Sequence, residues 1–202
     1  MNRRSAVGIL ALLTVAIGSP VLFSNRTYYP ADFYSAWRPA ERGPVAIQNR
    51  IHSDIIDAYW PFDQFLHEEL QQNRLPWWNP RFFCGYPQHA DFASSAYYPP
   101  KLILFRLLPV TRAHAILLLM HLFLTGWAMW ELLRRLDIHG PAALTGAIGW
   151  MLCGTSFAWF KYSHAGPVMA ALPAALVFVH DRRAWAAALA LGVAILGSTP
   201  PL

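Results

Sequence analysis

Five apolar blocks constrain this chain more than any other feature of its sequence. They cover residues 5–23, 113–133, 142–160, 165–180 and 184–199. A helix of about 20 apolar residues crosses the roughly 30 Å hydrocarbon core of a bilayer and satisfies its own backbone hydrogen bonds where water is absent. Because 55% of the residues are hydrophobic and only 13% are charged, the sequence predicts an all-α multipass membrane protein with about five transmembrane helices.

The charged residues are distributed unevenly, and their distribution argues against a nucleic-acid partner. Residues 24–101 contain seven Lys or Arg and eight Asp or Glu, whereas the rest of the chain contains nine basic and three acidic residues. The basic excess that produces the net charge of +5 therefore lies beside the apolar blocks, where basic residues orient helices in a membrane. We expect membrane lipids as partners and no nucleic acid.

The basic residues also predict an orientation. Gly18-Ser19-Pro20 is a poor signal-peptidase site, so the first block is interpreted as an uncleaved helix. The positive-inside rule places the N-terminus in the cytoplasm together with the two arginine pairs, and places residues 161–164 outside. These pairs are Arg134-Arg135 and Arg182-Arg183. The sequence therefore predicts a multipass membrane protein whose N-terminus is cytoplasmic and whose residues 24–110 are extracytoplasmic.

Three regions follow from this topology. Residues 1–23 form the first transmembrane helix, residues 24–110 form a large extracytoplasmic loop, and residues 111–202 contain four further transmembrane helices. The sequence stops where the fifth helix would leave the membrane, so we expect a longer parent protein of which this chain is the amino-terminal part.

The extracytoplasmic loop contains a predicted amphipathic helix at residues 55–73. Apolar residues recur there at helical spacing, and Pro61 is expected to kink or divide the helix because proline lacks the N–H that the ladder needs. Residues 75–100 are rich in proline and aromatic residues, which is typical of an ordered, irregular loop held by ring packing. Residues 101–109 are expected to form a short interfacial helix.

Carboxylates of this loop supply the predicted catalytic pair, Asp54 and Asp91, and a candidate substrate-binding group, Asp57. Asp54 and Asp57 lie at the start of the amphipathic helix and Asp91 lies in the irregular loop. A carboxylate at the membrane surface can act as a general base or hold a metal ion that carries a sugar phosphate. The structural alternatives are capping by Ser53 or Asp54, a favourable helix-dipole position for Asp57, and an Asx turn at Asp91.

Histidine and lysine residues supply further candidates. His89, a candidate substrate-binding residue, neighbours Asp91. Lys161 and His164 lie in a short outer turn, where they are expected to face the same external cavity as Asp54 and to bind phosphate. The alternative for Lys161 is snorkelling to the interface. His52 and Asp54 can contribute to a divalent metal site, but no recognisable metal-ligand spacing supports one.

Some polar residues are expected to have structural roles. His121, in the middle of the second block, is expected to bond a neighbouring helix, and Glu131 is expected to pair with the arginines that follow it. Cys84 and Cys153 are expected to stay unpaired.

Several motifs resemble one family of membrane proteins. They are Ser53-Asp54, Leu75-Pro76-Trp77-Trp78-Asn79-Pro80, Gly85-Tyr86-Pro87, Ala90-Asp91, Tyr97-Tyr98-Pro99-Pro100, His121-Leu122-Phe123-Leu124 and Leu132-Leu133-Arg134-Arg135-Leu136. Together they resemble the amino-terminal part of the bacterial YfhO-like multipass proteins, which are placed among the GT-C glycosyltransferases. The resemblance covers nearly all of the chain from Asp54 onward.

The resemblance implies a location in the bacterial cytoplasmic (inner) membrane and a function. GT-C enzymes transfer a sugar from a polyprenyl-phosphate donor to an acceptor on the outer face, and an acidic residue near the end of their first helix lies in a cavity roofed by amphipathic helices. Asp54 matches that position, Lys161 or His164 would steady the donor phosphate, and the acceptor would be an envelope polymer or lipid. The GT-C core needs more helices than this chain contains. The alternatives are a transporter or lipid-handling protein without chemistry, and an inactive fragment.

Overall fold

The computed structural model is all-helical in the part of the chain that it describes, which comprises residues 2–24, 26–37, 46–47 and 53–198. The elements follow one another as α1 (Arg3–Leu22), α2 (Ala31–Trp37), η2 (Ile55–Tyr59), α4 (Trp60–Gln71), η3 (Gln88–Ala90), η4 (Phe92–Ser94), α5 (Pro99–Leu107), α6 (Val110–Arg135), α7 (Gly140–Met151), α8 (Gly154–Ala158), α9 (Ala165–His180) and α10 (Ala184–Gly197). His52, a predicted metal ligand, lies outside the described residues.

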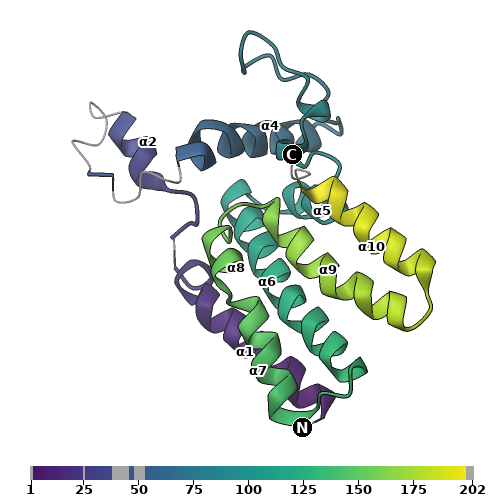
Figure 1. Cartoon of the computed structure of the whole chain (residues 1–202). Helices are drawn as coiled ribbons and strands as arrows, with labels where there is room; N and C mark the ends of the chain where they lie inside the picture. Colours follow the sequence, from purple (N-terminus) through teal and green to yellow (C-terminus); the bar gives the residue numbers. More distant parts are fainter. Residues whose placement is uncertain (1, 25, 38–45, 48–52, 199–202) are drawn as a thin grey trace.

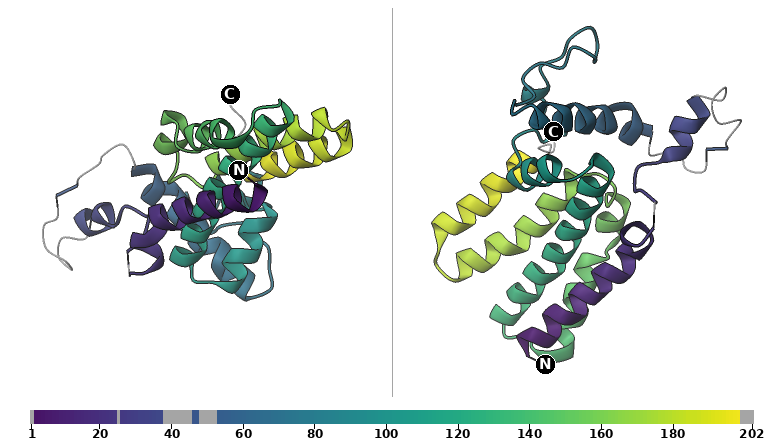
Figure 2. Two further views of the ribbon diagram at one scale, coloured as in Figure 1. Left: turned by 90° about the horizontal axis from the view of Figure 1, so that it is seen from below. Right: turned by 180° about the vertical axis from the view of Figure 1, so that it is seen from behind.

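The long helices form a bundle around α6, and α4 lies across one end of it (Figure 1). α6 packs against α1, α7, α9 and α5, while α9 also packs against α10. The view from behind in Figure 2 shows α4 at the end opposite the N-terminus. The segment that follows the first long helix therefore covers one end of the bundle.

Two helices have the length and composition of membrane spans. α1 has 20 residues and a mean hydropathy of 2.1, and α6 has 26 residues and a mean hydropathy of 1.7. α9 and α10 are apolar but have only 16 and 14 residues, which correspond to about 24 and 21 Å of helix. Of the five spans that the sequence predicts, the described residues thus include two that reach the length of a hydrocarbon core.

The third apolar block is not the single helix expected across residues 142–160. It divides into α7 and α8 at Leu152 and Cys153, because Cys153 has an extended backbone conformation with ψ of 159°. The hydroxyl of Ser156 donates to the carbonyl oxygen of Trp150 at 3.1 Å, which gives this helix-end carbonyl a side-chain donor at the break.

The helix predicted at residues 55–73 is present and is divided as expected. Residues 55–59 form a π-helix and Trp60 begins α4, with Pro61 in its first turn. The helix ends at Gln71. Asn73 then adopts a left-handed conformation with φ of 58°, and the N–H of Arg74 donates to the Glu69 carbonyl oxygen at 2.9 Å.

The loop after α4 is irregular and held mainly by side chains, as predicted. Among the described residues its one extended pairing is an isolated bridge between Asn79 and Tyr86. The buried Asn79 amide donates to Gln88 at 2.9 Å, and Gln88 donates to the carbonyl oxygen of Phe62 at 2.9 Å. Phe62 also stacks against Tyr86, with ring centroids 5.9 Å apart. These contacts attach the loop to α4. The short helix expected at residues 101–109 is α5.

Candidate functional site

The predicted catalytic residue Asp54 lies directly before the π-helix. The N–H of Trp60 donates to the carbonyl oxygen of Ile55, five residues earlier, which is the spacing of a π-helix. Pro61 is the next residue, and its missing N–H prevents the usual α-helical bond at that point. Single π turns occur frequently at functional sites, because they place side chains in a register that an α-helix does not provide.

Asp54 is exposed and does not cap the helix. Its side chain makes no capping hydrogen bond and accepts one from the Ser53 hydroxyl at 3.3 Å. The structure therefore does not show the capping role that the sequence offered as the alternative for Asp54. Asp57 is also exposed, on the π-helix itself.

Aromatic side chains from the turn between α8 and α9 contact Tyr59, at the end of the π-helix that follows Asp54. The Tyr59 ring meets Tyr162 edge to face, with centroids 5.5 Å apart, and stacks on His164 at 5.3 Å. Burial and the negative charge of Asp54 raise the pKa of Tyr162, so Asp54 lies within electrostatic range of that hydroxyl. The structure thus brings the first loop together with the turn between α8 and α9.

Tyr59 lies within electrostatic range of both carboxylates that were predicted as a catalytic pair. Burial is the largest cause that raises the pKa of Tyr59. Smaller contributions come from the negative charges of nearby groups, which are Tyr162, Asp54, Asp91 and Asp63. Both predicted carboxylates therefore influence one phenol group, although the structure places neither in direct contact with it.

Asp91 and His89 are fixed by the loop that contains them. Asp91 accepts hydrogen bonds from the Tyr86 hydroxyl and from the Ala93 N–H, each at 2.7 Å. The second bond is that of an Asx turn, which was the structural alternative for this residue. His89 Nδ1 lies 2.7 Å from the carbonyl oxygen of Trp77. Both side chains hold the loop together.

His164 and Lys161 differ in what they can offer a phosphate. Burial and the nearby charge of Lys101 lower the pKa of His164 to about 4, so the ring is neutral at pH 7 and can donate a hydrogen bond but supplies no charge. Lys161 is half-buried directly before Tyr162. Within the described part of the chain Lys161 forms no ion pair, and it remains the better candidate for binding a phosphate.

A buried ionic cluster beneath α4 was not anticipated from the sequence. Asp63 is fully buried and lies 2.6 Å from the ammonium of Lys101, which is itself only 1% exposed. The Tyr29 hydroxyl donates to Asp63 at 2.5 Å, and His114 Nδ1 lies 3.5 Å from the same carboxylate oxygen. Lys101 also donates to the carbonyl oxygen of Ser94 at 2.7 Å.

The electrostatics of this cluster favour an ionised Asp63. Burial alone would raise the pKa of Asp63, but Lys101 and His114 together hold that pKa below its ordinary value. The cluster joins the first loop, α4, α5 and the start of α6, and Lys101 extends its electrostatic influence to His164.

A cleft with a volume of about 570 Å³ adjoins this cluster at Tyr29. Its walls include Tyr29, Trp60, Gln64, Glu68 and Arg81. Arg81 and Glu68 form an ion pair of 2.7 Å at its edge. The cleft therefore offers both aromatic surface and polar groups.

Other predictions from the sequence can be compared directly with contacts. His121 bonds the Tyr98 hydroxyl at 2.7 Å, as expected for a histidine held by a neighbouring segment. Glu131 pairs with Arg135 at 2.9 Å. Both cysteines are free. In the residues that the structure describes, no three His, Cys, Asp or Glu side chains are grouped to share a metal ion.

The chain was compared with protein family models, with curated proteins and with solved structures, and none of the three comparisons finds a match.

Proposed function

We propose that this chain is the amino-terminal part of a membrane glycosyltransferase that moves a sugar from a polyprenyl-phosphate donor to an acceptor in the bacterial cell envelope. The observation that supports this most directly is the position of Asp54. It is an exposed carboxylate directly before the π-helix that contains Tyr59, and Tyr59 contacts Tyr162 and His164 at the end of the bundle that the amphipathic helix α4 covers.

The membrane location rests on the long helices and on their surroundings. α1 and α6 are long and apolar enough to span a bilayer. Large apolar side chains are exposed along the outer faces of α1, α9 and α10, which is unfavourable in water and favourable in lipid. They include Leu12, Leu172, Leu176, Leu189 and Ile195. The arginine-rich end would face the cytoplasm and the end with Asp54 would face outward.

The candidate site residues have separate roles in the proposed transfer of the sugar. Asp54 accepts the proton of the acceptor hydroxyl while that oxygen bonds to the anomeric carbon of the sugar. The bond from the anomeric carbon to the donor phosphate breaks, and the polyprenyl phosphate leaves with the electron pair. Lys161 balances the charge on this phosphate and neutral His164 donates a hydrogen bond to it. Asp57 contacts the substrate, and Asp91 with His89 keeps the neighbouring loop in place.

Replacing Asp54 by asparagine in the chromosomal copy of the gene tests the proposal. The change keeps the size and polarity of the exposed side chain but removes the base. We expect at least a hundredfold loss of envelope glycan transfer, in line with the contribution of a general base, at unchanged protein abundance. The measurement is incorporation of radiolabelled sugar into the envelope fraction of membranes.

Asp137→Asn is the matched control, because Asp137 is an exposed aspartate at the opposite end of the bundle. It should leave transfer unchanged. Normal transfer by the Asp54 variant at normal abundance would remove Asp54 from the mechanism.

A lipid-handling or transport protein without chemistry is the second candidate, and the break between α7 and α8 favours it. Broken helices inside a bundle are characteristic of transporter binding sites. This alternative predicts that the Asp54 variant alters movement of a lipid or solute and that no glycosidic bond is formed.

A further inference from the structure

A groove runs between α6, α9 and α10, which lie side by side in both Figures 1 and 2. Its volume is about 610 Å³. The groove exists because the helices present small side chains to one another at this surface, and such side chains do not fill the space between the helices. They include Ala128, Ala170, Ala174, Ala190 and Ala194.

The two ends of the groove differ in charge. Tyr98 and His121 lie at the end near α5, and they are bonded to each other. The other end is lined by Arg3, Arg135 and Arg183 together with one carboxylate, Glu131. The groove therefore has an uncharged end and an arginine-rich end.

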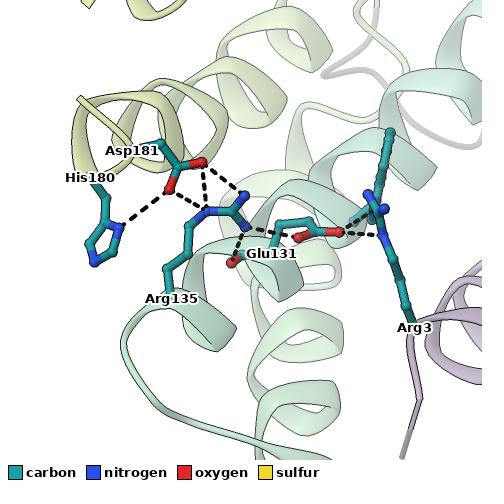
Figure 3. Close-up of polar contacts among 6 residues, drawn as sticks. Arg3, Glu131, Arg135, His180 and Asp181 are labelled. Atoms are coloured by element: carbon teal, nitrogen blue, oxygen red, sulfur yellow. Dashed lines mark hydrogen bonds and ion pairs between the residues drawn. The ribbon is translucent and has the colours of Figure 1, made fainter. Parts of the chain in front are cut away.

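The arginines at the charged end are not equally available. Figure 3 shows Arg135 between Asp181 and Glu131, with Arg3 on the other side of Glu131. Arg3 and Arg135 thus share two carboxylates. The Arg183 guanidinium forms no hydrogen bond or ion pair with any described residue.

The wider surroundings of this end are also basic. Six arginines and three carboxylates lie on the segments that meet there, which leaves a net charge of +3. These residues are Arg3, Arg4, Arg134, Arg135, Arg182, Arg183, Glu131, Asp137 and Asp181. An occupant of the groove therefore meets a positive potential at this end.

We infer that the groove binds an anionic phospholipid, with its phosphate at Arg183 and one acyl chain along the alanine-lined surface. The arginine side chain suits phosphate recognition, and basic pockets between membrane helices bind anionic headgroups. From His121 to Arg135 the groove follows 15 residues of α6, a rise of about 21 Å. This exceeds the roughly 15 Å that one leaflet contributes to the hydrocarbon core.

The inference rests on the membrane location proposed above, but it does not depend on glycosyl transfer. A second copy of the chain would also bury the apolar surface of the groove. It would not neutralise the basic end, however, unless it placed carboxylates against the arginines. An amphiphile with one apolar chain and one anionic head matches both parts of the groove.

Native mass spectrometry of the purified chain in detergent tests the inference. The probes are phosphatidylglycerol and phosphatidylcholine with identical acyl chains. We expect phosphatidylglycerol to be retained in preference to phosphatidylcholine. Arg183→Gln should lower that preference about fivefold, which corresponds to about 1 kcal/mol for one basic residue near an anionic surface. Since Arg183 has no partner among the described residues, this variant should fold normally.

Two further variants serve as a control outside the groove and as a test of its apolar surface. Arg74→Gln changes an exposed arginine near α4, at the other end of the bundle, and should leave the preference unchanged. Ala174→Phe places a large ring in the groove and should reduce retention of both lipids.

Equal retention of the two lipids would overturn the inference, as would an equal effect of Arg183→Gln and Arg74→Gln. A lipid-free dimer as the main species would assign the groove to a second copy instead. Lipid preference that persists in Asp54→Asn, together with lost sugar transfer, is the expected combination. Sugar transfer by a protein that shows no lipid preference would refute the lipid-binding inference and leave the proposed glycosyl transfer standing.

Discussion

Replacing Lys101 by methionine should destabilise the protein strongly, because it leaves a buried carboxylate without its main counter-charge. Asp63 is 0% exposed, Lys101 is 1% exposed, and their charged atoms lie 2.6 Å apart. Removing one partner of a buried ion pair costs about 3–5 kcal/mol. In a chain of about 200 residues, each kcal/mol lowers Tm by about 2–4 °C, so we expect a decrease of about 6–20 °C.

A double-mutant cycle tests the physical reason for this loss. Asp63→Leu combined with Lys101→Met removes both charges, so the double variant should recover most of the stability that either single variant loses. Thermal unfolding of the detergent-solubilised chain, followed by circular dichroism, measures each Tm. Arg74→Met is the control, because the Arg74–Glu69 pair is exposed and its loss should leave Tm nearly unchanged. If the losses of the single variants simply add, the two charges are not coupled and the reasoning is refuted.

Three further predictions follow from local geometry. Since the folded-state pKa of Asp63 is below its ordinary value of 3.8, its ionisation stabilises the fold above about pH 4. That stabilisation should disappear as pH falls through the folded pKa, and Asp63→Asn should abolish this part of a Tm-against-pH curve. NMR titration should show a histidine midpoint near pH 4 that is absent in His164→Gln; a midpoint near 6.5 for His164 would contradict its burial. Gly166→Ala places a methyl group 2.5 Å from His121 Cβ and should cost about 1–3 kcal/mol, whereas Gly149→Ala, with open space around it, should leave Tm unchanged or higher.

The parts of the fold that depend on local sequence were predictable. Hydrophobic composition located α1 and α6, helical spacing located the amphipathic segment, and Pro61 predicted its division. The proline and aromatic residues of the loop predicted irregular structure held by ring contacts. Each of these features depends on residues close together in the chain.

The buried ionic cluster required contacts that local patterns do not encode. Asp63, Lys101, Tyr29 and His114 are brought together from four separate segments of the chain. One signal was present, because Asp63 lies between Phe62 and the apolar residues that follow, on the face that the helix buries. A carboxylate at such a position needs a buried partner, but the sequence does not identify which residue provides it.

The candidate site could be predicted only in part, because its contacts also join segments that lie far apart in the chain. The expectation that the outer turn faces the same region as Asp54 agrees with the contacts of Tyr59 with Tyr162 and His164. The sequence did not indicate that burial would keep His164 neutral. The break between α7 and α8 was also missed, because residues 142–160 are apolar throughout and composition alone does not reveal an extended residue at Cys153.

The central claim is that the segment containing Asp54 lies on the outer face of the membrane, and the natural cysteines test it directly. Cys84 is exposed in the loop after α4, and Cys153→Ser leaves Cys84 as the single remaining thiol of the chain. Intact spheroplasts are treated with a membrane-impermeant maleimide before and after permeabilisation. Our account predicts that Cys84 reacts to the same extent in both samples. Labelling only after permeabilisation would place the loop and Asp54 in the cytoplasm and contradict the account.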